Sequence, residues 1–318
     1  MNIHFLDRAT LGMDLDLEAF STLGTLKVFD YTESAERQEN LAQAQVAVAN
    51  KVIFDRTLLE ACPQLKLILL TATGYNTVDL VACKNLGIGV CNVKGYSTPS
   101  VVQHTLAMLL YLMEPLRFLD DTVQSGDYSR SRQFTHLEKT FPEVSGKVWG
   151  ILGMGKIGRG VASVAQALGA KVLWTSTSGV QRDEPWPQVS LNELLQQTDI
   201  LTIHAPLNDS TRNLLDEKEL RTLKPKSYLI NVGRGGIVNE EALSRVLLQG
   251  HLAGVGLDVM ETEPLPLASP LFQALKTNRL YITPHVAWAS VESRNRCMDE
   301  VRFNLESWLT GGSRNRVD

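Results

Sequence analysis

Short apolar runs alternate with amphipathic segments along the chain. In the first part these runs predict strands, with helices or turns between them, at residues 3–6, 26–29, 46–49, 67–70 and 89–92. The run 67–70 (LILL) is apolar at every position, which is typical of a strand buried on both faces. Because strands and helices alternate, we expect a parallel sheet covered by helices in a small α/β domain.

The same alternation resumes after residue 146 and predicts a second parallel sheet. Its strands are expected at 147–152, 171–175, 199–203, 227–231, 254–258 and 279–283, and later helices at 191–198, 216–223, 240–249 and 290–309. Between the halves, residues 101–126 predict a long, largely apolar helix that Pro115 kinks or breaks. The polar stretch 127–146 predicts a long connection of the kind that is often functional or forms an interface.

The stretch 147–176 predicts a dinucleotide site. Between its two strands lies Gly153-Met154-Gly155-Lys156-Ile157-Gly158, which fits G-x-G-x-x-G and leads into an amphipathic helix. The first glycine allows the tight turn, the second lets the backbone approach a pyrophosphate, and the third brings the helix close to the strand. The N–H groups at the positive end of that helix then face the phosphates. The alternative is a purely structural tight turn.

Polar side chains follow four strands of the second predicted sheet. They are His204, Arg234, the cluster 258–263 with Asp258 and Glu263, and His285. Because parallel strands end at one edge of a sheet, we expect these side chains to gather beside the dinucleotide. Two loops of the first domain, 71–76 and 95–99, also follow strands; they are candidates to line a cleft, or are simply turns punctuated by glycine and proline.

These residue types suit hydride chemistry, in which the protein supplies a proton and holds the substrate. A histidine such as His285 is suited to the proton, a bonded Glu263 would fix its tautomer, and the fork of Arg234 would bind a carboxylate. Each also has a structural interpretation: a solvated turn arginine, an exposed acidic loop, a histidine that caps a strand end. His204 is the competing base, and the backbone of Ala205-Pro206 after it favours a cofactor-side role.

Composition narrows the class of protein. The chain has 318 residues, which suggests two domains, and its content of 44% hydrophobic and 21% charged residues is ordinary for a soluble enzyme. A net charge of −4 without a basic stripe argues against nucleic acid as a partner. The N-terminus lacks a secretory core and the apolar run 106–113 is too short for a membrane helix, so we expect no membrane and a cytoplasmic location. Cys62, Cys83, Cys91 and Cys297 lack metal-type pairing and are expected to be buried, reduced thiols, with no metal site.

Three motifs resemble the D-isomer-specific 2-hydroxyacid dehydrogenases. They are LINVGRGG at 229–236, GLDV with ETEP within 256–264, and TPHVAW at 283–288, in a match that covers nearly the whole chain. Ala-Trp after the histidine resembles the glycerate dehydrogenases, also called hydroxypyruvate reductases. The resemblance implies an oxidoreductase that moves a hydride between a nicotinamide cofactor and a small D-2-hydroxy acid or its 2-oxo partner, with glycerate/hydroxypyruvate or glyoxylate as the leading substrates.

The resemblance also implies where the site residues fall. Catalysis would rest on Arg234, Glu263 and His285, and Thr73 and Gly74 would join Arg234 and His285 in binding the substrate. Cofactor contacts are implied at Thr105, Gly153, Met154, Gly155, Lys156, Ile157, Ser176, His204, Ala205, Pro206, Thr211, Asn231, Val232, Gly233, Asp258 and His285.

The architecture implied by the resemblance is α/β, with two Rossmann-like, doubly wound parallel-sheet domains and a cleft between them. A flavodoxin-like, substrate-side domain would comprise residues 1–98 plus 285–318, and a dinucleotide-binding Rossmann domain residues 99–284. Family members are usually homodimers, so a homodimer is expected here.

The sequence departs from the family at the strand after the glycine motif, which usually ends in an aspartate that binds the ribose hydroxyls of NAD. Here Ser176 takes that place, followed by Thr177 and Ser178, and the nearest arginine is Arg182. We therefore expect NAD as the cofactor, with NADP as the alternative because no carboxylate repels its 2′-phosphate. Two other functions stay open: a dinucleotide-binding regulatory protein like the corepressors that resemble this family, and a dehydrogenase for another 2-oxo acid or phosphite.

Overall fold

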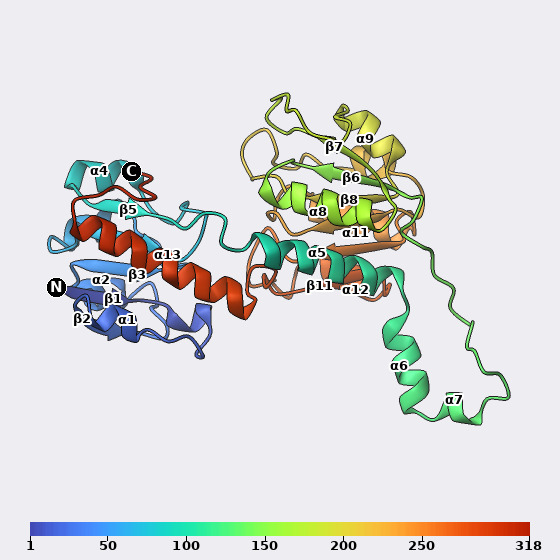
Figure 1. Cartoon of the computed structure of the whole chain (residues 1–318), viewed down its shortest axis with the longest axis horizontal. Helices are drawn as coiled ribbons and strands as arrows, with labels where there is room; N and C mark the ends of the chain where they lie inside the picture. Colours follow the sequence, from blue (N-terminus) through green and yellow to red (C-terminus); the bar gives the residue numbers. More distant parts are fainter. The chain divides into compact units, whose positions relative to one another are not determined.

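The computed structural model describes residues 1–318 as two compact units. The first consists of Met1–Ser97 with Ala289–Asp318 and the second of Thr98–Trp288, and each is a parallel sheet flanked by helices (Figure 1). The chain therefore returns to the first unit after Trp288, whereas the boundary expected from the sequence was after residue 284. The physical reason is that the chain just after His285 is bonded within the second unit, where Ser100 Oγ donates to Ala287 O at 2.7 Å.

The first unit is built on a five-stranded parallel sheet in the order β2-β1-β3-β4-β5. Its strands are β1 (Asn2–Phe5), β2 (Thr25–Val28), β3 (Val46–Ala49), β4 (Leu67–Leu70) and β5 (Gly89–Cys91). Its helices are η1 (Arg8–Leu11), α1 (Glu18–Ser21), α2 (Arg37–Leu41), α3 (Arg56–Ala61), α4 (Leu80–Leu86) and α13 (Val291–Leu309). Every residue of β3 and β4 is buried, so these two apolar runs form the centre of the core.

The second unit is built on a six-stranded parallel sheet in the order β11-β10-β9-β8-β6-β7. Its strands are β6 (Val148–Leu152), β7 (Lys171–Thr175), β8 (Ile200–Ile203), β9 (Tyr228–Asn231), β10 (Gly254–Leu257) and β11 (Leu280–Ile282). Its helices are α5 (Thr98–Met113), α6 (Leu116–Gln124), α7 (Asp127–Arg130), α8 (Lys156–Ala167), α9 (Leu191–Gln197), α10 (Glu217–Thr222), α11 (Glu240–Leu248) and α12 (Leu271–Leu275).

The strand order of the second sheet reverses at β6, which lies between β7 and β8. Ligands of doubly wound sheets bind beyond the carboxyl ends of the strands at such a reversal, because the loops leave toward opposite faces there and open a crevice. The loop after β6 carries the glycine motif, and the loop after β8 begins at His204. The topology therefore places both segments at the position where a ligand is expected.

The long helix expected over residues 101–126 is divided in two. α5 ends at Met113 and α6 begins after Pro115, which has φ −80° and ψ 44°. Proline has no N–H to donate and disfavours a helical residue before it, so the helix ends there. α5 packs on β9, β10 and α8, which accounts for its apolar character.

Beyond α5, residues 114–147 form a projecting segment that we call the arm. In Figure 1, α6, α7 and the irregular chain after them extend away from the sheet of the second unit. Phe134 is 90% exposed, Leu137 73% and Phe141 53%. Apolar side chains so exposed within one short segment are typical of an interaction surface.

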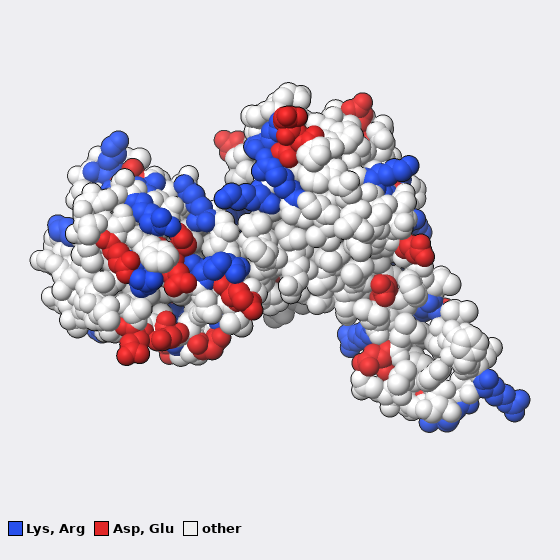
Figure 2. Space-filling model, in the orientation of Figure 1, with Lys and Arg blue, Asp and Glu red and all other residues white.

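The outer surface mixes charges of both signs. Figure 2 shows Lys and Arg side chains interspersed with Asp and Glu over the visible face, without a continuous basic stripe. None of the helices has the length and apolar character needed to cross a bilayer.

Candidate active site

The glycine loop after β6 has the shape of a phosphate cradle. Gly153 has φ +99°, and a Cβ there would come within 2.9 Å of Ala205 N. A Cβ on Gly158 would lie 2.3 Å from Gly153 O, whereas one on Gly155 would meet nothing within 4 Å. The outer two glycines are therefore required by the packing of the loop, while the middle one faces open space where a ligand can approach the backbone.

The N-terminus of α8 contributes the charge for this cradle. Gly155 is its N-cap, no side chain caps the first turn, and no acidic residue lies in that turn. The first N–H groups of a helix lack partners within it and carry its positive dipole end. The loop, the helix end and the open space at Gly155 together fit the pyrophosphate of a dinucleotide.

The ring nitrogens of His204, which follows β8, are buried without a protein partner. Neither of its ring nitrogens accepts or donates a hydrogen bond, and burial lowers the pKa of the imidazole to about 3. A neutral imidazole at working pH is a poor general acid, which argues against His204 as the proton donor. Two buried polar atoms without partners fit a group that binds at this wall, consistent with a cofactor-side role.

The loops beside His204 are shaped by internal hydrogen bonds. Thr211 is fully buried and its Oγ1 donates to Pro206 O at 2.8 Å. Asn231, at the end of β9, accepts from Gly233 N at 3.0 Å and donates to Arg234 O at 2.9 Å. The side chains of Thr211 and Asn231 thus hold backbone that borders the crevice.

Arg234 lies on the exposed tip of the loop after β9. Its Nη1 donates to Gly233 O at 2.8 Å, and the next residue, Gly235, would place a Cβ 1.9 Å from Met260 O. Only glycine lets the loop after β9 approach the loop after β10 so closely. This approach brings the segment with Arg234 against the segment that leads to Glu263.

Glu263 and His285 form a short charge-assisted pair. Glu263 Oε2 lies 2.6 Å from His285 Nδ1, and Glu263 Oε1 accepts from Met260 N at 3.1 Å. Their side chains are 23% and 30% exposed, so the pair is shielded yet accessible. With Nδ1 donating to the carboxylate, Nε2 is the nitrogen that can exchange a proton with a substrate.

His285 has an unusual backbone conformation, with φ +54°. A left-handed non-glycine residue costs on the order of 1–3 kcal/mol and persists only where its surroundings impose it. Buried Asp258 imposes it here through three hydrogen bonds: from Thr283 Oγ1 at 2.6 Å, Val286 N at 2.8 Å and Ala287 N at 2.9 Å. Trp288 Nε1 adds a fourth restraint by donating to His285 O at 2.9 Å.

Two residues of α5 that the sequence analysis missed also hold this loop. His104 Nε2 lies 3.1 Å from Thr283 Oγ1 and 3.6 Å from Asp258 Oδ1, and Ser100 Oγ donates to Ala287 O. The signal available in the sequence was their spacing: two polar residues four apart lie on one face of an otherwise apolar helix. A buried helix rarely carries such a pair without a partner for it.

Other expected site residues have hydrogen bonds of their own within each unit. Thr105 is fully buried, and its Oγ1 donates to Val101 O at 2.7 Å. Thr73 and Gly74 lie in the first unit after β4, where Thr73 Oγ1 donates to Val93 O at 2.8 Å. Ser176 directly follows β7, and its Oγ lies 3.2 Å from Ser178 Oγ.

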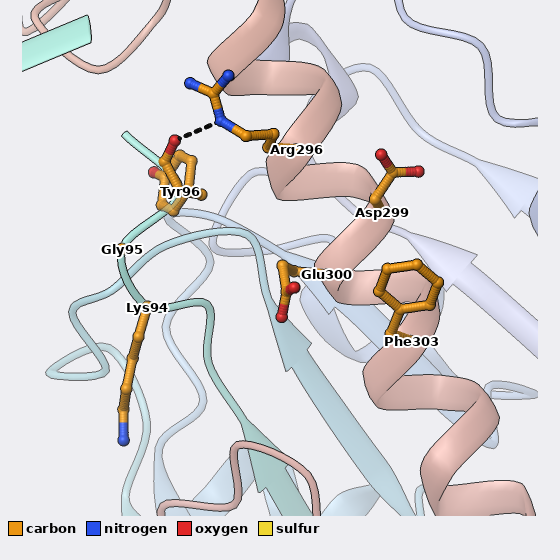
Figure 3. A pocket seen from close by; sticks show the side chains of 7 residues that line it. All are labelled: Lys94, Gly95, Tyr96, Arg296, Asp299, Glu300 and Phe303. Atoms are coloured by element: carbon orange, nitrogen blue, oxygen red, sulfur yellow. Dashed lines mark hydrogen bonds between the residues drawn. The ribbon is translucent and has the colours of Figure 1, made fainter. Parts of the chain in front are cut away.

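A hollow in the first unit holds none of these residues. Figure 3 shows it between α13 and the chain after β5, lined by Lys94, Gly95, Tyr96, Arg296, Asp299, Glu300 and Phe303. The hollow has two cationic side chains, Lys94 and Arg296. Arg296 Nε already donates to Tyr96 O at 2.9 Å. No group of three His, Cys, Asp or Glu side chains is placed to hold a metal ion anywhere in the chain.

Comparison with known proteins identifies the family. Residues 106–287, which contain the glycine loop, Arg234, Glu263 and His285, match the D-isomer specific 2-hydroxyacid dehydrogenase, NAD binding domain. The chain belongs to the D-2-hydroxyacid dehydrogenases. It is therefore an oxidoreductase that moves a hydride between a nicotinamide cofactor and a D-2-hydroxy acid, and nothing in the comparisons supports the alternative of a regulatory protein.

Three similar proteins match the chain over nearly its whole length. A glycerate dehydrogenase of Methylorubrum extorquens is 35% identical over 99% of this chain and 98% of that protein. A hydroxypyruvate reductase of Blautia hydrogenotrophica is 34% identical over 96% and 95%. The structure of a D-lactate dehydrogenase from Aquifex aeolicus, complexed with NAD and lactic acid, has a TM-score of 0.84 and 28% identity over 98% of this chain and 96% of that one. The two-domain fold and an NAD-type cofactor are thus confirmed.

The glycines of the dehydrogenase cradle provide a matched test. Gly158→Ala forces a Cβ against Gly153 O, and such overpacking costs about 1–3 kcal/mol, so the melting temperature should fall by roughly 3–8 °C. Gly155→Ala meets no atom and has an ordinary φ of −89°, so its melting temperature should hardly change while the NADH Kd rises about tenfold or more. Thermal unfolding and NADH titration of both variants check this; equal melting temperatures would contradict it.

His204 gives a prediction about pH. Its pKa is about 3 in the folded chain and returns to about 6.5 on unfolding, so between these values the unfolded chain binds more protons. This contribution to stability is present above pH 6.5 and declines as the pH falls toward 3. His204→Asn should reduce the loss of unfolding free energy between pH 7 and pH 5 by about 1–2 kcal/mol, measured by urea denaturation. His251→Asn is the control, and an unchanged pH dependence in His204→Asn would refute the burial argument.

Proposed function

We propose that Arg234, Glu263 and His285 form the catalytic site of this dehydrogenase. The observation that carries the proposal is the 2.6 Å contact between Glu263 Oε2 and His285 Nδ1, on a loop that Asp258 holds in a strained conformation. The proposed substrates are glycerate and hydroxypyruvate, with glyoxylate next. Their support is that similar proteins over nearly the full chain are named glycerate dehydrogenase, hydroxypyruvate reductase and glyoxylate reductase.

In the reducing direction, His285 Nε2 donates a proton to the carbonyl oxygen of the 2-oxo acid. When bound, the nicotinamide supplies the hydride to the carbonyl carbon, so that the C=O group becomes CH–OH. Glu263 holds Nδ1–H and thereby fixes which nitrogen faces the substrate.

Arg234 binds the carboxylate of the substrate in this proposal. The guanidinium presents paired N–H donors that match a carboxylate, and it polarises the neighbouring carbonyl through its positive charge. Asn231 fixes the backbone beneath it by donating to Arg234 O. Thr73 and Gly74 of the first unit are proposed as further substrate contacts.

The cofactor contacts are proposed around the switch point of the second sheet. Gly153 to Ile157 would cradle the pyrophosphate, His204 to Pro206 would form one wall, and the backbone of 231–233 would lie beside the nicotinamide. Asp258 is proposed to act by holding the loop that bears His285, because both of its carboxylate oxygens already accept hydrogen bonds.

We further propose that the dehydrogenase forms a homodimer through the arm. Phe134, Leu137 and Phe141 expose apolar surface there, and a two-fold arrangement would let each copy cover the same surface of the other. The cytoplasm is the proposed location, since all four cysteines are unpaired and buried.

The catalytic histidine gives the sharpest activity test. His285→Gln removes the proton donor and should lower kcat by several powers of ten, more than the ~10²–10⁴-fold usual for a general acid because orientation is lost as well. The NADH Kd should stay within about threefold. The control is His251→Gln, because the His251 ring is bonded to Leu223 O and belongs to neither the proposed catalytic site nor the cofactor site. A kcat within about tenfold of the unchanged enzyme would overturn the assignment.

The arm can be tested by mass. Phe134→Glu with Leu137→Glu places two charges on apolar surface, so a dimer built there should dissociate to a species of about half the mass by light scattering at micromolar concentration. Leu267→Glu is the control, because Leu267 is 88% exposed on another loop. A monomeric unchanged protein, or a dimer that both charges leave intact, would contradict the proposal.

A further inference from the structure

The loop after β7 carries Glu184, which forms an ion pair with Arg159 that has no role in the proposed proton and hydride transfer. It begins at Ser176, beside the glycine loop, because Gly153 N donates to Thr175 O at 3.0 Å. In a doubly wound sheet this position faces the ribose of the dinucleotide, and an acid there selects NAD by repelling a 2′-phosphate. Here the position is neutral, so selection between NAD and NADP must rest on other groups.

The turn at Ser176 presents hydroxyl groups. Ser176 Oγ accepts from Ser178 N at 3.3 Å and lies 3.2 Å from Ser178 Oγ. Hydroxyls bond equally well to a ribose hydroxyl or to a phosphate oxygen. A firm 2′-phosphate site also needs a cation, and an arginine is the residue best suited to it.

The arginine closest in sequence to the glycine loop is already engaged. Arg159, in the first turn of α8, donates to Glu184 Oε1 through both Nε at 2.8 Å and Nη2 at 2.6 Å. Glu184 is 7% exposed and Arg159 42%, and the contact with Arg159 lowers the pKa of the glutamate. The two hydrogen bonds from Arg159 therefore hold the Glu184 carboxylate in its charged form.

The loop that carries Glu184 is anchored to α8 by a second contact. Trp186 Nε1 donates to Gln166 Oε1 at 3.1 Å, and Trp186 O accepts from Trp174 Nε1 at 3.0 Å. These bonds hold Trp186, two residues after Glu184, against α8 and against β7. The loop that carries Glu184 therefore has hydrogen bonds that do not involve Arg159.

From this arrangement we propose that Glu184 is the coenzyme-specificity residue of this dehydrogenase. By holding the guanidinium of Arg159, it withholds a phosphate-binding cation from the turn at Ser176 and so favours NAD over NADP. The expected discrimination is weaker than an aspartate at position 176 would give, because Glu184 neutralises a cation and does not itself occupy the ribose site. The proposal rests on the assignment of the glycine loop to dinucleotide binding.

The test is binding of NADH and NADPH to the full chain by calorimetric titration, without substrate. Glu184→Gln keeps the size of the side chain and removes its charge, so Arg159 is released. The NADPH Kd should fall about tenfold, the scale of one charge-assisted contact, while the NADH Kd stays within about threefold. In Glu184→Gln with Arg159→Gln, the gain in NADPH affinity should disappear.

Other outcomes are equally decisive. If the ion pair only clamps the loop, Glu184→Gln will weaken both coenzymes alike, and the proposal is overturned. It is also overturned if NADPH affinity does not change in Glu184→Gln but falls in Arg182→Gln, since a different cation then binds the phosphate. Failure of the unchanged chain to bind either coenzyme would instead refute dinucleotide binding at the glycine loop.

Discussion

The structure around the reaction depends on one buried carboxylate. Asp258 is 1% exposed and accepts three hydrogen bonds from the segment 283–287, which forces His285 into a left-handed conformation. Without that carboxylate, the N–H groups of Val286 and Ala287 would lose their acceptor, and a buried N–H left unpaired, such as that of Ala287, costs about 1–3 kcal/mol. The imidazole proposed as the proton donor is thus positioned by an acid whose hydrogen bonds all go to the loop that bears it.

Two carboxylates therefore position His285 in different ways. Asp258 fixes the backbone of the loop, and Glu263 fixes the imidazole by binding Nδ1. The two carboxylates differ in burial. Asp258 is enclosed in the core, whereas Glu263 is 23% exposed beside the position proposed for the substrate. A carboxylate that holds the imidazole must lie beside it, whereas one that only holds backbone is most effective away from water.

Much of this arrangement could be predicted from the sequence. Parallel strands end at one edge of a sheet, so the sequence alone predicts that the residues after β8, β9, β10 and β11 gather there, and the glycine spacing indicates the ligand. The missing parts depend on tertiary contacts. The partners of His104 are distant in sequence, at Asp258 and Thr283, and the need for Gly235 arises only because Met260 O approaches it. The end of the second unit at Trp288 has the same origin, since hydrogen bonds with Ser100 of α5 and with Asp258, just after β10, hold the segment before it.

The loop after β7 lacks the aspartate that usually discriminates between NAD and NADP in this family, and we propose that another pair of residues takes over that discrimination. An aspartate at position 176 would bind the ribose and repel a phosphate in one step. With serine there, binding and repulsion are separated: hydroxyl groups can hold either coenzyme, and we propose that the charge balance is set by the pair of Arg159 and Glu184. A separated arrangement is easier to alter, because a single change at Glu184 shifts the balance without removing any group that binds the ribose. Coenzyme preference in this chain is accordingly a property of an ion pair and not of the strand end where the family usually encodes it.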